Sequence, residues 1–223
     1  MKIYEKRAFT MIELIMVIVV LGIMASIAMP RLERDLRQES GDNILSAIRY
    51  TQHMALMDNK ANINESPAEN WQKALWQIRF ASTNGEWYYV VGSNSDYSNN
   101  IDQSEAAIDP VNGKYMHSSD EIIDSDESPN IFLTRKYSIK NVDFSSCVGQ
   151  TGSAGNAAAT VHHIAFDYLG RPHRGVFGAT YVLSTLLHAD CTLKFEFKDG
   201  SDDLLILIRK DTGYANIVDQ NAS

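Results

Sequence analysis

Phe9–Ala28 reads FTMIELIMVIVVLGIMASIA, and this run of 20 residues contains a single charged residue, Glu13. As an α-helix it would extend for roughly 30 Å, which is enough to cross the hydrocarbon core of a bilayer. Residues 1–8 before it carry a net charge of +2, and Pro30 and a charged stretch follow it. The run therefore predicts a long N-terminal helix whose first half lies in an apolar environment.

The rest of the chain has the composition of a globular domain. The 223 residues have a mass of 25.0 kDa and a mean hydropathy of −0.23, which excludes a polytopic membrane protein. The net charge of −8 argues against a general nucleic-acid binder, because such proteins present a basic face. Two cysteines are too few for a disulfide-built miniprotein or a four-cysteine zinc module.

Three interpretations of the N-terminal run compete. A cleaved secretory signal peptide predicts a shorter apolar core with a small-residue cleavage site beyond it. A plain signal anchor would keep the positive N-terminus in the cytoplasm and send the remainder across the membrane. Neither accounts for Glu13, because a carboxylate within a bilayer is costly unless it snorkels to the interface. The third interpretation gives this carboxylate a function.

The sequence resembles the class III leader of type IV prepilins and type II secretion pseudopilins over residues 6–15, KRAFTMIELI. The resemblance implies that a prepilin peptidase cuts between Ala8 and Phe9 and then N-methylates Phe9. The family mostly has Gly before the cut, so Ala8 is a departure for which we expect slower processing. The resemblance also implies that Glu13 of one subunit pairs with the Phe9 α-amine of its neighbour during assembly, a pairing that a low dielectric favours.

The helical pattern continues beyond the membrane-length run. Five residues recur at i, i+3, i+4, i+7 and i+11, a spacing that places them in one stripe along a helix. They are Ile44, Ala47, Ile48, Thr51 and Ala55. We expect a helix over 9–59, with a transmembrane or filament-core part at 9–30 and an amphipathic stalk at 31–59. Gly22 and Pro30 are expected kink sites, because proline removes a backbone hydrogen bond. The family resemblance allows local melting between them in an assembled filament.

Beyond residue 60 the pattern alternates with a period of two, as in β-strands. The predicted strands lie at 76–80, 86–91, 131–139, 162–167, 192–198, 204–209 and 214–218. Turn residues join the last three strands, which predicts an antiparallel meander. The helix followed by strands predicts an α+β fold, in which a long N-terminal helix packs on an antiparallel sheet domain at residues 60–223. The family resemblance implies that this is a pilin-like fold.

Three further segments resemble GspH/FimT-type minor pseudopilins in the order of that family: 50–59, 164–172, and 205–208 with 212–214. The resemblance implies a minor pseudopilin that is assembled into a type II secretion pseudopilus for protein export. Its partners would be other pilin-like subunits, the prepilin peptidase and the inner-membrane assembly platform. It implies a single-pass inner-membrane protein with a cytoplasmic N-terminus and a periplasmic globular domain, which then enters the filament. The alternative is a minor type IV pilin that primes a pilus or takes up DNA.

Two cysteines, Cys147 and Cys191, lie 44 residues apart. In the implied topology both face the periplasm, which is an oxidising compartment. A disulfide between them is therefore expected, and two separate thiols are the alternative.

An insertion at residues 93–130 is dominated by Ser, Asn and Asp, and a long solvated loop is expected there. Calcium binding is a sharper hypothesis, because calcium prefers oxygen ligands. The candidates are Asp120, Glu121, Asp124, Asp126 and Glu127. Their spacing matches no EF-hand loop, so we expect no cofactor.

Histidines give only weak signals for a metal site. His162 and His163, with His173 and Asp167, contain ligand types, but neighbouring residues on a strand point to opposite faces. No nucleophile-elbow, zinc-protease or phosphate-loop motif is present, so an enzyme is not expected. A signal-anchored periplasmic enzyme remains as a remote alternative.

Nucleic-acid contact is not expected either. Removing residues 1–8 takes away three basic residues and one acidic residue, which changes the net charge from −8 to −10. The C-terminal stretch 217–223 contains no basic residue. Contact with DNA would depend on local cations such as Arg171, His173 and Arg174.

Overall fold

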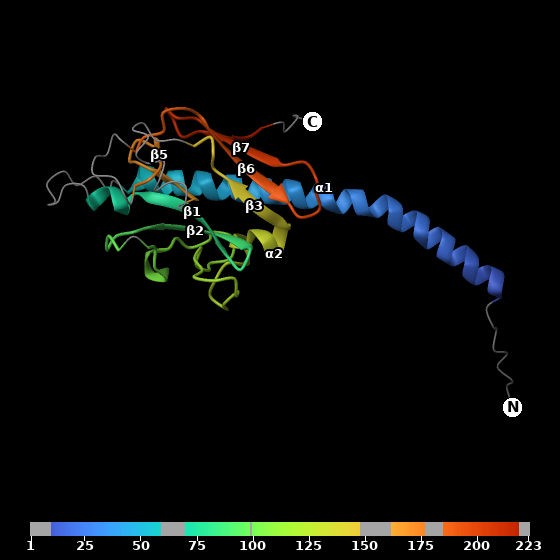
Figure 1. Cartoon of the computed structure of the whole chain (residues 1–223). Helices are drawn as coiled ribbons and strands as arrows, with labels where there is room; N and C mark the ends of the chain where they lie inside the picture. The colour runs from blue at the N-terminus through green and yellow to red at the C-terminus, as the bar shows by residue number, and fades with distance from the viewer. Residues whose placement is uncertain (1–9, 59–69, 99, 148–161, 177–184, 219–223) are drawn as a thin grey trace. The chain divides into compact units, whose positions relative to one another are not determined.

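The computed structural model describes residues 10–58, 70–98, 100–147, 162–176 and 185–218, apart from the side chains of residues 26–35, 70 and 72. The chain divides into two compact units, Met1–Gln38 and Glu39–Ser223. The helix α1 (Met11–Met57) begins in the first unit and ends in the second. The second unit also contains all the strands (Figure 1).

The second part of α1 is held by the predicted stripe. Ile44, Ala47, Ile48, Thr51 and Ala55 are all at most 4% exposed, which confirms the helical spacing. The Thr51 hydroxyl donates to the Ala47 carbonyl at 2.7 Å, so the one polar member of the stripe is satisfied within the helix. The helix ends at Met57, close to the predicted end, and it is continuous through Gly22 and Pro30.

Within the described residues, eight strands form two antiparallel four-stranded sheets. The first sheet has the order β2 (Glu86–Ser93), β1 (Trp76–Thr83), β4 (His162–Phe166) and β5 (Pro172–His173). The second has the order β3 (Ile139–Asp143), β6 (Cys191–Phe197), β7 (Leu204–Ile208) and β8 (Ala215–Ile217). The second sheet contains the predicted C-terminal meander, and the α+β prediction is confirmed.

One core joins the two sheets and the second part of α1. The ring of Phe80 on β1 lies 5.5 Å from that of Phe144 and 5.6 Å from that of Phe195 on β6, measured between centroids. Ile44 and Ile48 of α1 belong to the same cluster of buried residues. Burial of these large apolar side chains is the main driving force for the unit.

Gln52 of α1 holds a turn from each sheet. Its Nε2 donates to the carbonyls of Gly170 and Thr212, at 2.8 Å each. Gly213 has a φ of +67°, and a Cβ there would lie 2.2 Å from the Gly170 oxygen. Only glycine therefore allows the β4–β5 and β7–β8 turns to approach each other so closely.

The prediction of a strand over 131–139 is wrong. This stretch contains a 3₁₀ turn η3 (Pro129–Ile131), a short helix α2 (Leu133–Tyr137) and only the start of β3. Ser128 caps the turn by accepting from the Asn130 N–H at 3.2 Å, and Ser138 ends the helix with a left-handed φ of 58°. These local caps outweigh the β-propensity of the apolar residues.

The insertion at 93–130 is a largely irregular loop, as expected, but part of it is packed on the fold instead of being solvated. Backbone hydrogen bonds add this insertion to the outer edge of β2: the Ala107 N–H donates to Val91 O at 2.8 Å, and the Val91 N–H donates to Met116 O at 2.9 Å. Ile101, Ala107 and Met116 are buried, each at most 4% exposed. The insertion thus covers a sheet edge that would otherwise be open to pairing with another chain.

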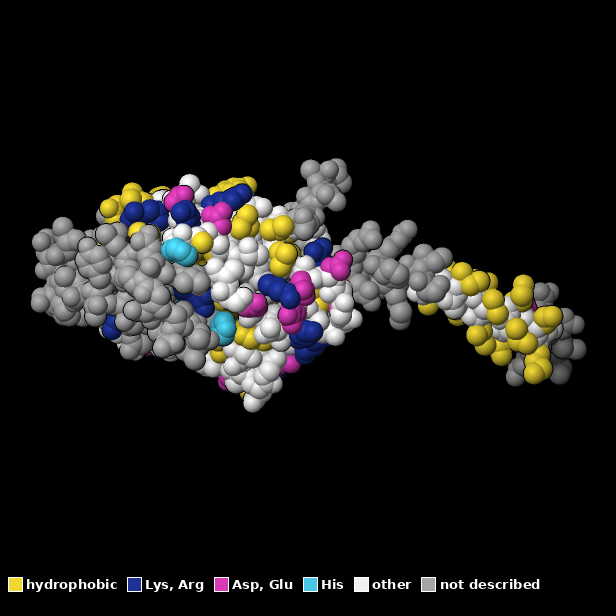
Figure 2. Space-filling view, turned by 45° about the horizontal axis from the view of Figure 1, so that its top comes forward, with side chains coloured by type: hydrophobic (Ala, Val, Ile, Leu, Met, Phe, Trp, Pro, Cys, Tyr) yellow, Lys and Arg dark blue, Asp and Glu magenta, His cyan; other side chains and the backbone are white. Residues whose placement is uncertain are grey.

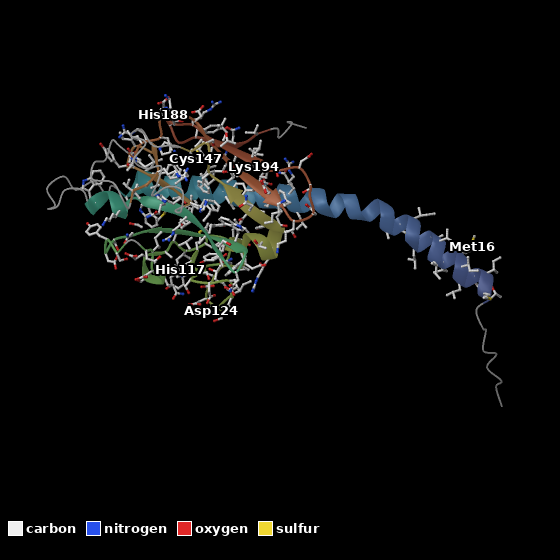
Figure 3. All side chains as sticks on the ribbon, viewed as in Figure 1. Met16, His117, Asp124, Cys147, His188 and Lys194 are labelled. Carbon is white, nitrogen blue, oxygen red and sulfur yellow. A yellow bond between two sulfur atoms is a disulfide. The ribbon has the colours of Figure 1, made fainter. Side chains whose placement is uncertain are left out.

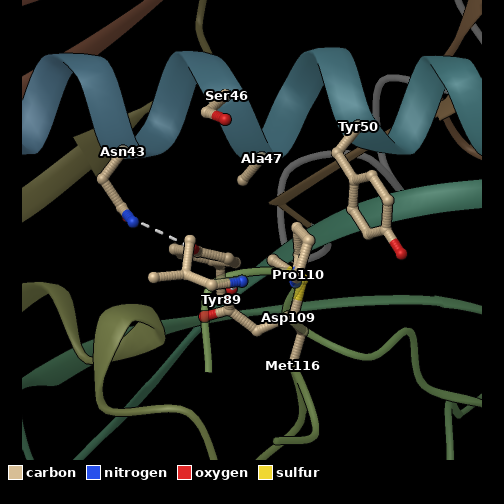
Figure 4. Close-up of a pocket in the computed structure, with 9 residues that line it drawn as sticks. Asn43, Ser46, Ala47, Tyr50, Tyr89, Asp109, Pro110 and Met116 are labelled. Carbon is tan, nitrogen blue, oxygen red and sulfur yellow. Dashed lines mark hydrogen bonds between the residues drawn. The ribbon is translucent and has the colours of Figure 1, made fainter. Parts of the chain in front are cut away.

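Asp109 is the centre of the insertion. Its carboxylate accepts from the Val111 N–H at 2.9 Å, the Ser128 hydroxyl at 2.5 Å, and the side-chain amides of Asn130 and Asn112 at 3.0 and 3.1 Å. It lies beside a small pocket of about 40 Å³ between α1, β2 and the insertion (Figure 4). The sequence signal was the turn Asp109-Pro110-Val111-Asn112-Gly113, whose residue types favour such local bonding.

Candidate assembly site

The start of α1 positions the carboxylate of Glu13. The N–H and the hydroxyl of Thr10 each donate to Glu13 Oε2 at 3.4 Å, and the Glu13 N–H donates to Thr10 Oγ1 at 3.3 Å. This Thr-x-x-Glu arrangement is a capping box, which satisfies backbone donors that a helix start leaves open. Glu13 is therefore also a capping residue, a role that the sequence reasoning missed. Ala8 and Phe9 lie outside the described residues.

Behind this cap, the side chains of residues 14–25 are apolar on all sides of the helix. Figures 2 and 3 show hydrophobic side chains, Met16 among them, standing out from the helix. Each of the following is at least 49% exposed: Met11, Ile12, Leu14, Ile15, Met16, Val17, Ile18, Val19, Val20, Leu21, Ile23 and Met24. A helix that is apolar all round is normally covered by lipid or by other protein.

Within the described residues, no helix combines the length and the apolar character that a membrane crossing requires.

Comparison with known proteins gives one result for this segment. A family model described as the prokaryotic N-terminal methylation motif matches residues 5–29. The matched range includes the predicted cut between Ala8 and Phe9, together with Glu13. The match supports a type IV pilin-like protein. It indicates a processed subunit that assembles with other pilin subunits after the action of a prepilin peptidase, and it is consistent with membrane anchoring.

No curated protein and no solved structure is significantly similar to the pilin-like chain.

The histidines of the globular unit are engaged in different places. Asp167 and His173 come together, with 3.2 Å between Oδ2 and Nε2, and His173 Nδ1 lies 2.8 Å from the Thr185 hydroxyl. His163 instead accepts from the Gly175 N–H at 3.1 Å, while the ring of His162 lies between those of Trp87 and Phe144. The described residues contain no group of three or more acidic, histidine or cysteine side chains suited to a metal.

Asp167, His173 and Thr185 are joined as the members of a catalytic triad are, because the imidazole contacts a carboxylate through one nitrogen and a hydroxyl through the other. Thr185 and His173 are fully buried, and Asp167 is 2% exposed. A catalytic hydroxyl must reach its substrate, and this one does not contact solvent. The arrangement therefore fixes the β4–β5 turn and β5.

Asp167 also binds Arg171 firmly. It accepts from the Arg171 N–H at 2.9 Å and from Arg171 Nε and Nη2, both at 2.8 Å. Burial raises the pKa of Asp167, but the hydrogen bonds from His173 and Arg171 outweigh it and lower this pKa to about 2. The carboxylate is thus charged throughout the physiological range and holds its partners in place.

The three cations considered for DNA contact are occupied within the fold. Arg171 is bound to Asp167, and His173 is buried between Asp167 and Thr185. Arg174 is only 5% exposed, and its Nη1 donates to the carbonyls of Phe144, at 2.6 Å, and Cys147. These residues stabilise β5 and its neighbours instead of forming a basic surface.

A disulfide joins Cys147 to Cys191, with 4.5 Å between the Cα atoms. The adjacent Ser146 reinforces this connection, because its hydroxyl donates to Thr192 O and accepts from the Thr192 N–H, both at 2.8 Å. The segment after β3 is thereby attached to the start of β6.

The calcium candidates in the insertion have separate partners. Asp120 accepts from the Ile122 N–H at 2.7 Å, and Asp126 accepts from the Gln103 side-chain amide at 2.7 Å. Asp124 is exposed, as its labelled position in Figure 3 shows. The described structure does not bring these carboxylates together around one position.

Proposed function

We propose that the chain is a minor pseudopilin of a type II secretion system, and that it acts by subunit assembly without catalysis. The observation that carries the proposal is the methylation motif at residues 5–29, in which Glu13 would be the fifth residue after the cut. In this proposal the cleaved chain stays in the inner membrane through residues 9–30, with its globular domain in the periplasm. It then enters a pseudopilus.

Three features of the structure support this proposal. The exposed apolar side chains of the first unit need a covering of lipid or of neighbouring helices. The second unit is a β-rich body with its own core, suited to a filament surface or tip. The disulfide Cys147–Cys191 fits an oxidising compartment such as the periplasm.

Glu13 would act by pairing with the α-amine of Phe9 in a neighbouring subunit. Two opposite charges in an apolar surrounding attract strongly, and each is costly there if it stays alone. The capping box gives the carboxylate a partner of its own while a subunit waits for assembly. Pairing would then set the axial register of each added subunit.

The test separates the charge of Glu13 from its capping role. Gln also serves at this position of a capping box, so Glu13→Gln keeps the cap but removes the charge. Thr10→Ala removes the hydroxyl cap and keeps the charge. We expect Glu13→Gln to be cleaved normally but to be lost from sheared filaments, whereas Thr10→Ala is incorporated. Normal incorporation of Glu13→Gln would refute the pairing mechanism.

A minor type IV pilin is the second candidate, because the same motif serves both systems. Deleting the gene distinguishes the two proposals. Deletion of a pseudopilin gene leaves secreted proteins in the periplasm and does not affect surface pili. Deletion of a pilin gene reduces surface pili and does not affect protein secretion. Secretion should be restored by the wild-type chain but not by Glu13→Gln.

A further inference from the structure

A polar cavity of about 220 Å³ lies between the first sheet and the insertion. Its floor is formed by strands β1 and β2, and its roof by the insertion. Figure 3 shows His117, one of the roof residues, on the side of β2 that faces away from α1. The lining residues are Arg79, Ala81, Tyr88, Val90, Asn100, Ile101, His117, Ser118 and Ser119.

The roof is held on the sheet by specific contacts. At Gly92 an added Cβ would lie 2.6 Å from Ile101 Cγ2, so the insertion touches the sheet directly there. Arg79 Nη1 donates to Asn100 Oδ1 at 3.2 Å, and His117 Nε2 bonds to the Ile101 carbonyl at 3.0 Å. The cavity is therefore a built feature between two ordered layers.

Arg79 supplies a cation to the cavity lining. A guanidinium has five N–H donors, and the bond to Asn100 uses one of them on a neutral oxygen. No carboxylate among the described residues forms an ion pair with it. Lys136, Arg171, Lys194, Lys198 and Arg209, by contrast, all have acidic partners. The guanidinium fork matches a carboxylate bidentately.

Other groups in the lining suit hydroxyls. The Ile101 carbonyl can only accept, so His117 Nε2 carries the proton and Nδ1 is left as an acceptor. Burial lowers the pKa of His117, which favours this neutral form over the cation. The Ser119 hydroxyl and the Asn100 amide add exposed groups that donate and accept. Ala81 and Val90 offer an apolar floor for C–H groups.

Unmet hydrogen-bonding capacity continues along the same face of β1. Gln77 is two residues from Arg79 and therefore lies on the same side of the sheet. It is fully buried, and neither atom of its side-chain amide has a hydrogen-bond partner. Native structures rarely leave such groups unpaired without a role.

We propose that this cavity binds a small hydroxylated carboxylate of the uronic acid class. Arg79 takes the carboxylate, and Ser119, His117 and Asn100 take the hydroxyls. A sugar-sized ring fits the volume, and its C–H face rests on Ala81 and Val90. This binding function is separate from assembly and does not depend on the proposed role of Glu13.

Calorimetric titration of the full chain in detergent micelles tests the proposal. The probes are glucuronate, glucose and acetate. Glucuronate carries both a carboxylate and hydroxyls, glucose carries only hydroxyls, and acetate carries only a carboxylate. We expect glucuronate to bind about tenfold or more tightly than either of the others, because only glucuronate offers both a carboxylate for Arg79 and hydroxyls for the neighbouring polar groups. Absence of glucuronate binding, or equal affinity for glucose or acetate, would overturn the proposal.

Two variants locate the site. Arg79→Gln should weaken glucuronate binding about tenfold or more, and Ser119→Val, on the exposed roof, by a smaller factor. Arg135→Gln removes an exposed cation from α2 and is the matched control, with unchanged affinity expected. A melting temperature near that of wild type shows that Arg79→Gln is folded. Wild-type affinity in the folded Arg79→Gln variant would overturn the assignment.

Discussion

Replacing Asp167 by Asn tests the buried cluster between β4 and β5. Hydrogen bonds from His173 and Arg171 lower the pKa of Asp167 from 3.8 to about 2. Each pKa unit corresponds to 1.36 kcal/mol, so the charged carboxylate contributes about 2 kcal/mol to folding. An Asn side chain has no charge and presents an N–H₂ group beside the donors of Arg171. We therefore expect Asp167→Asn to lower the free energy of unfolding by about 2 kcal/mol at pH 7.

The pH dependence follows from the direction of this shift. A carboxylate with a lowered pKa in the folded state contributes stability that is fully present above its unfolded pKa. For Asp167 this contribution is lost as the pH falls from about 4 towards 2. The difference between wild type and Asp167→Asn should therefore be constant above pH 5 and shrink across that acid range.

Urea unfolding followed by tryptophan fluorescence, in a series of buffers from pH 7 to pH 2.5, measures both effects. Asp211→Asn is the matched control, because Asp211 is an exposed carboxylate in the neighbouring β7–β8 turn. We expect this control to stay within about 0.5 kcal/mol of wild type. A similarly small effect of Asp167→Asn at pH 7, or a difference that does not change between pH 5 and pH 2.5, would refute the reasoning.

Two further predictions concern the insertion and the disulfide. Asp109→Ala removes the acceptor of four hydrogen bonds. It should lower the free energy of unfolding, measured in urea, by about 2–4 kcal/mol. Asp124→Ala, at an exposed site, is the control and should have a stability near that of wild type. Serine at both Cys147 and Cys191 opens a link across 44 residues and should cost about 3–4 kcal/mol, as should reduction of the wild type. Labelling of the folded, unreduced chain by a thiol reagent would contradict the disulfide.

Local patterns predicted most of the regular structure correctly. The stripe from Ile44 to Ala55 repeats with the period of a helix, and this period correctly indicated which face of α1 is buried. β6 and β7 alternate buried and half-buried residues, so their period of two is also readable in the sequence. These elements have one buried face, and a single face gives a regular signal.

The prediction failed where local bonds or distant partners decide the conformation. Residues 131–139 have apolar side chains that suit a strand, but Ser128 and Ser138 cap helical turns there. The two-residue strand β5 was not predicted, because its stability comes from pairing with β4 and from the buried His173. So short a segment has no period of its own.

The N-terminal methylation motif is a property of the sequence alone, because it consists of consecutive residues 5–29. The helical and strand periods are equally local. Only the tertiary structure decides which polar side chains are free to act. It buries His173 and Arg174 among internal partners, and it folds the polar insertion onto β2 so that Arg79 faces a cavity. These outcomes depend on residues far apart in the chain, because burial and pairing are set by the neighbours that folding brings together.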